Sequence, residues 1–149
     1  MGIPALILAA TYAAFLPTVP GSLNPDVTQD NIGQTICVSG WTKTIRPPAS
    51  YTNKLKRQQM AAMGLTDPPR SYEEDHLISL EIGGNPTDPD NLWPQPWDGQ
   101  FGAHRKDVIE TRLKRLVCDG TISLDQAQTA IRTDWVAAYV TYVGPLTPN

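Results

Sequence analysis

Residues 75–106 constrain the fold of this chain more than any other stretch, because they hold both of its histidines within a dense run of structural signals. Residues 72–82 are rich in apolar side chains and predict a strand, and the two glycines after them are a turn signal. A loop stiffened by two prolines leads to residues 91–94, which predict a short second strand. Residues 103–118 then repeat apolar side chains at helical spacing. The sequence therefore predicts two strands followed by a helix.

The remaining segments are expected to surround these three elements. Residues 31–41 form a short apolar run broken by glycine and predict a strand or an extended segment. A helix is predicted from about residue 50 to residue 63. Ser123 and Gln126 form the signature of a capping box, which opens a last helix with apolar residues at helical spacing to about residue 142. The expected fold class is α+β.

The N-terminus bears on where the protein works. Residues 3–16 are apolar but too short to span a bilayer as a stable helix. They are typical of the core of a signal peptide, although the basic segment that usually precedes such a core is missing. Residues 1–21 are therefore interpreted as a signal-like segment or an N-terminal arm, and residues 22–149 as a single domain. We expect a secreted or cell-surface monomer without membrane insertion.

The two cysteines, Cys37 and Cys118, lie far apart in the sequence. Because no Cys-x-x-Cys pair occurs, a zinc ribbon is excluded. The cysteines either form one disulfide or remain as two buried free thiols. Export of the protein would favour the disulfide, because disulfides form in oxidising compartments. The bond would close a long loop and stabilise the fold by roughly 2–5 kcal/mol.

Charge is distributed unevenly along the chain. The net charge of -3 argues mildly against a protein that binds nucleic acid in bulk. Residues 31–66, however, contain lysines and arginines but no acid, and a second basic set lies in residues 105–115. The acids gather in residues 73–98, between these two segments. Two basic segments that flank an acidic centre suit a phosphodiester substrate with a bound cation. Two solvated helix faces are the alternative interpretation.

The order of the Asp-His pair, Gly-Gly, Asn-Leu-Trp-Pro and a second histidine resembles the HNH nucleases, which have the ββα-metal (His-Me finger) fold. The resemblance covers the motif core, residues 72–118. It implies that Asp75 is a metal ligand and that His76 activates a water molecule. It also implies that Asn91 orients His76, through its side chain or backbone, and that His104 is the second metal ligand. Oxygen ligands with one imidazole suit Mg²⁺ or Mn²⁺ and also permit Zn²⁺ or Ni²⁺.

These residue types match the needs of phosphodiester hydrolysis. The reaction requires a deprotonated water, a stabilised leaving oxygen and a neutralised phosphate. A neutral imidazole, with an ordinary pKa of about 6.5, can take the proton from water. Arg105 and Lys106 follow His104 at the start of the predicted helix, where anions are favoured. We expect them to bind phosphate, with plain surface charge as the alternative role.

Two features depart from the HNH pattern. Many HNH proteins carry zinc-binding cysteine pairs around the motif, and this chain has none. The spacing from Asn91 to His104 is also longer than in many versions. If His104 is misplaced, Lys106 or Asp107 occupies the third position of the motif and the metal ligation changes.

The expected function is a metal-dependent endonuclease that cuts DNA. Sequence selectivity is expected to be low, because nothing resembles a separate recognition domain. One alternative is a ribonuclease with the same chemistry. Another is a disulfide-stapled binding module that keeps the ββα scaffold without catalysis. Trp93 and Trp97 are interpreted as packing residues, with base stacking as the alternative.

Overall fold

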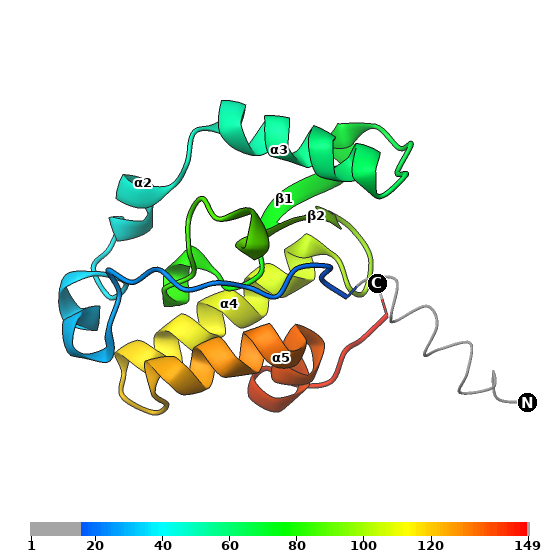
Figure 1. Ribbon diagram of the computed structural model, residues 1–149. Coiled ribbons are helices and arrows are strands. Elements are labelled where there is room, and N and C mark those ends of the chain that lie inside the picture. The colour runs from blue at the N-terminus through cyan, green and yellow to red at the C-terminus, as the bar shows by residue number, and fades with distance from the viewer. Residues whose placement is uncertain (1–15, 149) are drawn as a thin grey trace, which may run out of the picture.

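The structure is a computed structural model, and it describes residues 16–148. Figure 1 shows α3 on one side of a small sheet and the pair α4 and α5 on the other. The elements in chain order are η1 (Gln29–Gln34), α2 (Trp41–Ile45), α3 (Ala49–Ala62), η2 (Pro69–Ser71), β1 (Tyr72–His76), η3 (Leu80–Ile82), η4 (Pro89–Asn91), β2 (Leu92–Pro96), α4 (Ala103–Cys118) and α5 (Leu124–Tyr142), where η denotes a 3₁₀ helix.

Strands β1 and β2 form a two-stranded antiparallel sheet in which His76 lies opposite Leu92. Helix α3 packs against both strands, whereas α4 packs against α5 and η3. The two longest helices enclose a core that includes Ile109, Leu113, Ile131 and Trp135. A two-stranded sheet with packed helices confirms the predicted α+β class. The order strand, strand, helix places the end of β1 close to the start of α4.

The predicted first strand is wrong beyond His76, where the chain leaves the sheet. The amide side chain of Asn91 takes the place of a strand partner: Ile78 N–H donates to Asn91 Oδ1 at 3.0 Å, and Asn91 Nδ2 donates to the Ile78 carbonyl at 3.1 Å. The Ser79 hydroxyl then accepts a hydrogen bond from Glu81 N–H and caps η3. The apolar residues after His76 therefore enter the core from a tight turn, not from the face of a strand.

The prediction for residues 31–41 is also wrong, because this segment holds part of η1 and a series of turns. The side chain of Asn31 accepts a hydrogen bond from Thr28 N–H at 2.8 Å and starts the 3₁₀ helix. Such local bonds from an Asn side chain compete with strand pairing. Ile36 still reaches the core and is fully buried.

The three long helices agree with the helical spacing of the sequence. The predicted bounds of α4 are those observed. Helix α3 ends one residue before its predicted end, and the prediction that Ser50 caps it is wrong, because Pro48 is the N-cap and Ser50 lies inside the helix. The predicted capping box is present at Ser123 and Gln126. Helix α5 is interrupted at Asp134, whose backbone is extended and whose Oδ1 accepts from Val136 N–H and Ala137 N–H. The carboxylate thus caps the helical turn that follows the break.

A segment near the N-terminus is bonded to the loop between the two strands. Gly21 N–H donates to the Asp90 carbonyl at 2.8 Å, and Asn24 N–H donates to the Gly83 carbonyl at 2.9 Å. Leu23 forms an isolated antiparallel bridge with Gly84. Residues 21–24 therefore belong to the folded part of the chain. The predicted signal-like segment lies outside the described residues up to residue 15.

Cys37 and Cys118 form the predicted disulfide, with their Cα atoms 5.7 Å apart. The bond joins the turns after η1 to the last residue of α4, and it is compatible with an extracellular protein. Within residues 16–148, no helix has both the length and the apolar character needed to cross a membrane.

Loss of the disulfide is expected to lower the free energy of unfolding by about 4 kcal/mol, because the bond restricts a long loop of the unfolded chain. The loop spans 81 residues. Urea unfolding of the Cys37→Ser/Cys118→Ser double variant, compared with the oxidised wild type, measures this difference. An unchanged unfolding midpoint would contradict the expectation.

Candidate active site

The candidate site is a polar cavity of about 150 Å³ at the end of β1. His76 lines the cavity together with Arg46, the residue directly after α2. The other charged residues of its wall are all carboxylic acids: Glu73, Glu74, Asp75, Glu81, Asp107 and Glu110. Acidic side chains are thus concentrated around one imidazole.

His76 is held as one particular neutral tautomer. Its Nε2 lies 2.9 Å from the carbonyl oxygen of Pro86. Because a carbonyl oxygen only accepts hydrogen bonds, Nε2 carries the hydrogen and Nδ1 keeps its lone pair. The ring is buried, and this burial lowers the pKa of His76 below its ordinary value, although the Pro86 carbonyl and Asp75 act in the opposite direction. The imidazole is therefore neutral at neutral pH, with Nδ1 as its proton acceptor.

Asn91 acts on His76 through the loop that carries Pro86. The Asn91 side chain is fully buried, and its Nδ2 donates to the Asn85 carbonyl at 2.9 Å. Its backbone carbonyl accepts from Leu77 N–H at 2.9 Å. These bonds fix the residue after His76 and the residue before Pro86. The Asn91 side chain thus bonds to the backbone between His76 and Pro86, and Ser22 N–H of the N-terminal segment also donates to its Oδ1 at 3.4 Å.

The loop also contains a close backbone approach at Gly84. A Cβ added to Gly84 would lie 1.7 Å from the carbonyl oxygen of Ile78. Only glycine fits such an approach without moving the backbone. The second glycine of the Gly-Gly pair is thus required for this contact between the backbone at Gly84 and the backbone at Ile78.

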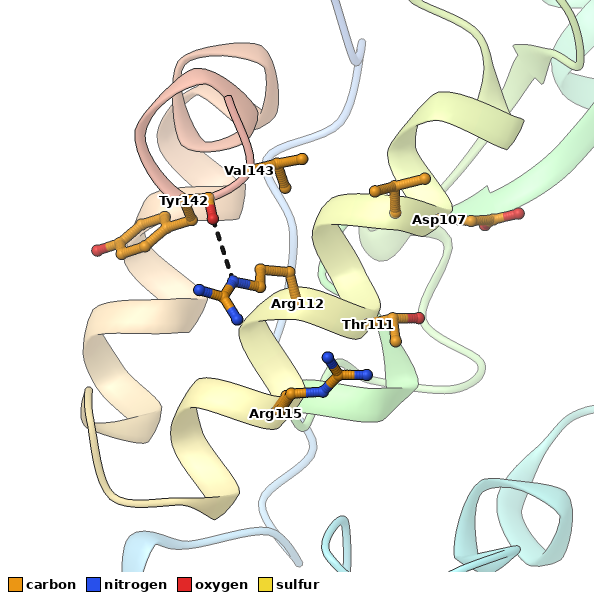
Figure 2. A pocket seen from close by; sticks show the side chains of 7 residues that line it. Asp107, Thr111, Arg112, Arg115, Tyr142 and Val143 are labelled. Carbon is orange, nitrogen blue, oxygen red and sulfur yellow. Dashed lines mark hydrogen bonds between the residues drawn. The ribbon is translucent and has the colours of Figure 1, made fainter. Parts of the chain in front are cut away.

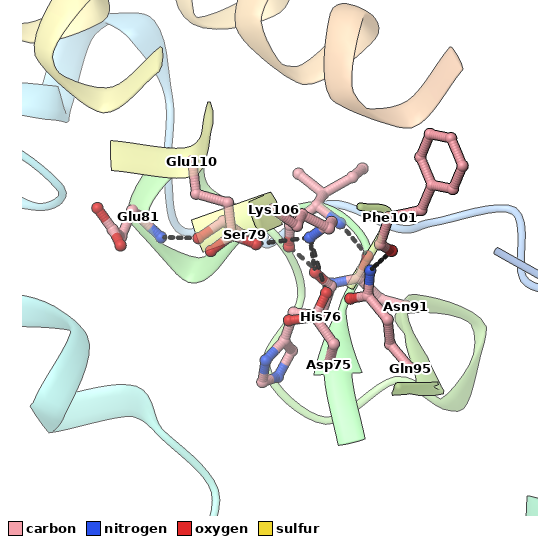
Figure 3. A network of polar contacts seen from close by, with 10 residues as sticks. Asp75, His76, Ser79, Glu81, Asn91, Gln95, Phe101, Lys106 and Glu110 are labelled. Carbon is pink, nitrogen blue, oxygen red and sulfur yellow. Dashed lines mark hydrogen bonds and ion pairs between the residues drawn. The ribbon is translucent and has the colours of Figure 1, made fainter. Parts of the chain in front are cut away.

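Lys106 is the fully buried centre of a polar network (Figure 3). Its Nζ lies 2.8 Å from Asp75 Oδ2 and donates to Glu110 Oε1 at 2.5 Å. It also donates to the carbonyl oxygen of His76 at 2.8 Å. Three oxygen atoms therefore surround the ammonium and link the end of β1 to two successive turns of α4.

The charges in this network balance approximately. Burial alone lowers the pKa of Lys106, but the attraction of Asp75 and Glu110 outweighs it, so that the pKa is raised and the ammonium stays charged. Burial, helped by repulsion from Asp75, raises the pKa of Glu110 even though Lys106 opposes the change. One ammonium neutralises one carboxylate, and the second carboxyl group keeps its proton more readily.

Other acids of the cavity wall are compensated only in part, by Lys56 for Glu74 and by Lys106 and Arg46 for Glu73. Burial raises the pKa of Glu73 and of Glu74 to about 8 in each case. It also raises the pKa of Glu81 and of Asp107. Both carboxylate oxygens of Glu74 are buried without a hydrogen-bond partner among the described residues. These carboxyl groups therefore keep their protons to a higher pH in the folded protein than in the unfolded chain.

His104 and Arg105, two of the residues singled out by the sequence, line a different hollow of about 200 Å³. The side chain of His104 is largely exposed, and its Nε2 lies 3.8 Å from Asp98 Oδ1. Arg105 Nη2 donates to the Thr147 carbonyl at 3.0 Å, and its guanidinium lies over the ring of Tyr139. The structure thus brings together Asp75, His76 and Lys106 but leaves His104 and Arg105 outside their cavity.

The residues present do not fit the predicted pair of metal ligands. Asp75 and His104 line separate hollows, and Asp75 faces the ammonium of Lys106. Among residues 16–148, no group of three or more His, Cys, Asp or Glu side chains is arranged to hold a metal ion. The dependence on a divalent cation stays a prediction from the resemblance.

Two larger hollows adjoin the cavity and carry basic residues. A groove of about 310 Å³ shares His76 and Arg46 with the cavity and is also lined by Lys56 and Trp97. On the other side, a hollow of about 530 Å³ shares Asp107 with the cavity and is lined by arginines of α4, which Figure 2 shows. Trp93 is buried, as the packing interpretation predicted, whereas Trp97 is half-buried and lines the groove.

Sequence reasoning missed Arg46 and misplaced the role of Lys106. Arg46 lies in a proline-rich connection far from the motif, and no local pattern brings it to His76. Lys106 was expected to bind phosphate, but it is fully buried and pairs with Glu110, four residues later on the same helix face. This i,i+4 pair was the available signal for a polar stripe directed inward.

No family model, curated protein or solved structure matches this chain. Its function therefore has to be inferred from the geometry of this cavity.

Stability in the absence of divalent cations is expected to fall as the pH rises from about 4.5 to about 8. Glu74 loses its proton near its ordinary pKa in the unfolded chain, but keeps it up to a pKa of about 8 in the folded protein. The folded state thus binds more protons across this interval, and the advantage disappears as the pH rises through it. Replacement of Glu74 by Gln is expected to raise the melting temperature at pH 8 by a few degrees (about 4 °C per kcal/mol).

Thermal unfolding in EDTA from pH 4.5 to pH 8.5, about the span of these pKa values, measures the effect. Asp30→Asn is the matched control, because it removes the carboxylate of an exposed residue that does not line the cavity. A Glu74→Gln variant with the same pH dependence as wild type would contradict the expectation.

Proposed function

We propose that this protein is an endonuclease that hydrolyses phosphodiester bonds in DNA, with His76 as the general base. The observation that carries the proposal is the fixed tautomer of His76. Because Nε2–H donates a hydrogen bond to the Pro86 carbonyl, Nδ1 has no hydrogen and can accept a proton from water. Burial keeps the ring neutral, which is the state that a base requires.

The adjoining groove supports the assignment of the substrate. A phosphate beside His76 would meet the guanidinium of Arg46, which lines both the cavity and the groove. Lys56 lies further along the same groove, where its Nζ also donates to the Tyr72 carbonyl at 2.9 Å. Positive charge at these points counters the repulsion between the acidic cavity and the nucleic-acid backbone.

The proposed reaction assigns a task to each side chain. His76 Nδ1 takes a proton from a water molecule, and the resulting hydroxide attacks phosphorus. The bond from phosphorus to the leaving oxygen breaks as the new bond forms. The leaving oxygen takes a proton from solvent water, and the His76 imidazolium returns its proton to solvent. Arg46 stabilises the negative charge on the phosphoryl oxygens during this step. Asn91 keeps Pro86 in place, so that Nδ1 remains the acceptor throughout.

A binding module without catalysis is the second candidate, and one observation favours it. The ion pair with Lys106 neutralises Asp75, the residue that the resemblance assigns to a metal. A scaffold of this kind can bind nucleic acid without cutting it. A ribonuclease has the same chemistry and differs only in substrate.

Conversion of supercoiled plasmid to nicked plasmid tests the proposed function. The wild-type protein is expected to nick DNA, and His76→Ala is expected to reduce the rate by at least about a hundredfold, because the general base is lost. Parallel reactions with Mg²⁺, with Mn²⁺ and with EDTA measure the predicted dependence on a metal. Cleavage of a linear RNA is compared with cleavage of a linear DNA of the same length. Faster cleavage of the RNA would favour the ribonuclease alternative.

His104→Ala is the matched variant, because it removes the other histidine from a separate hollow. Equal loss of nicking in both variants would support the predicted metal ligand His104 and contradict the geometry described above. Undiminished nicking by a folded His76→Ala variant would eliminate His76 as the base. Binding of DNA without nicking under any condition would favour the binding module.

Arg46→Ala is expected to lower the nicking rate by about a hundredfold, the usual cost of losing one group that stabilises transition-state charge. Arg57 on α3 is exposed and lines neither the cavity nor the groove, so that Arg57→Ala serves as the control. Initial rates over a range of plasmid concentrations separate a loss of binding from a loss of turnover. Equal rates for the two variants would remove Arg46 from the mechanism.

A further inference from the structure

The strongest unexplained feature of the site is a positive charge sealed inside it. Lys106 has no exposed surface, although a lysine is one of the side chains least often buried. Its Nζ lies 2.8 Å from Asp75 Oδ2, the atom that would otherwise present negative charge at the end of β1. Glu110 and the carbonyl oxygen of His76 supply the other two oxygens.

This set of neighbours resembles the surroundings of a bound cation. Two carboxyl groups and one backbone carbonyl converge on a single point, and hard divalent ions are bound by oxygens of these types. The ammonium occupies that point. Since a divalent ion on the same Asp75 oxygen would lie close to the ammonium, the two positive charges would repel each other in a buried setting.

We propose that Lys106 replaces a metal ion at Asp75, so that the side chain of Lys106 is the permanent cation of this site and Asp75 binds no divalent ion. Lys106 is a positioning residue in this arrangement. It holds the carbonyl of His76 and the carboxylate of Asp75 against α4, and it touches no substrate because it is sealed from solvent. The proposal concerns cation binding and stands whether or not the protein cuts DNA.

The alternative third position of the motif, Asp107, behaves differently from Lys106. Asp107 is exposed and lines both the cavity and the hollow beside it. Its carboxylate is therefore open to solvent ions, whereas Asp75 is buried against the ammonium. Weak binding of a cation at the exposed acids is compatible with the proposal, which is specific to Asp75.

Removal of Lys106 is expected to create a metal site. In Lys106→Ala, the carboxyl groups of Asp75 and Glu110 would face an empty volume next to the carbonyl of His76. Mn²⁺ would fill this volume and restore the missing positive charge. The variant is expected to unfold at a lower temperature than wild type in EDTA and to recover part of the loss when Mn²⁺ is added.

The test measures Mn²⁺ binding by the full chain with its disulfide intact, after removal of metals with EDTA and dialysis. Electron paramagnetic resonance of free Mn²⁺ counts the bound equivalents for wild type, Asp75→Asn, Lys106→Ala and the double variant Lys106→Ala/Asp75→Asn. Lys54→Ala is the control, because Lys54 is exposed on α3. The expected result is equal binding by wild type, Asp75→Asn and Lys54→Ala. Lys106→Ala should then bind one additional equivalent that the double variant lacks.

Two results would overturn the proposal. The first is an equivalent of Mn²⁺ that wild type binds and Asp75→Asn loses, since Asp75 would then be a metal ligand beside Lys106. The second is a folded Lys106→Ala variant that gains no Mn²⁺. If Lys106→Ala does not fold, the comparison of wild type with Asp75→Asn decides the question alone. Plasmid nicking is not a readout here, so failure of this proposal is distinct from failure of the proposed nuclease function.

Discussion

The buried ammonium of Lys106 is the interaction on which the arrangement of the site depends. A charge in the interior is costly unless partners surround it, and here three oxygens from β1 and α4 do so. Because the partners come from two elements, the ammonium fixes the end of the strand relative to the helix. The position of His76, the next residue after Asp75, follows from that connection.

A second constraint comes from the loop between the strands, which determines how the imidazole is presented. The Asn91 amide bonds to the backbone of Ile78 and Asn85 in this loop, and Gly84 permits a close approach to the Ile78 carbonyl. The loop in turn supplies the Pro86 carbonyl that selects the tautomer of His76. A neutral base and a sealed cation, each fixed by the backbone, thus lie side by side at one edge of a two-stranded sheet.

The sequence predicted those parts of the fold that depend on periodic patterns. Helices α3, α4 and α5 follow from apolar spacing and capping residues, which act over a few residues and are visible locally. The end of β1 at His76 was not predictable in this way, because the side chain of Asn91, thirteen residues beyond Ile78, replaces the strand partner of Ile78. The turns after Thr28 escaped prediction for a similar reason, since an Asn side chain competes with strand pairing there.

The candidate site was predicted in part. Asp75 and His76 were found because they are adjacent in a motif, and the structure brings Lys106 to them from the helix start. The spacing of the motif placed His104 at the same centre, but the helix turns that residue outward and Lys106 inward. Arg46 could not be found from spacing, because it reaches the cavity from the connection between α2 and α3, thirty residues before His76.

The disulfide has a topological consequence for the site. The ring of chain that it closes runs from Cys37 to Cys118 and contains every residue that lines the cavity, from Arg46 to Glu110. A protease that cut the backbone once within this ring, for example in the exposed segment around Gly64, would open the ring without releasing a fragment. The part of the chain before the cut, which carries Arg46, would remain joined to both strands and α4 through the disulfide. The cavity residues therefore belong to a part of the chain that one backbone cleavage cannot separate.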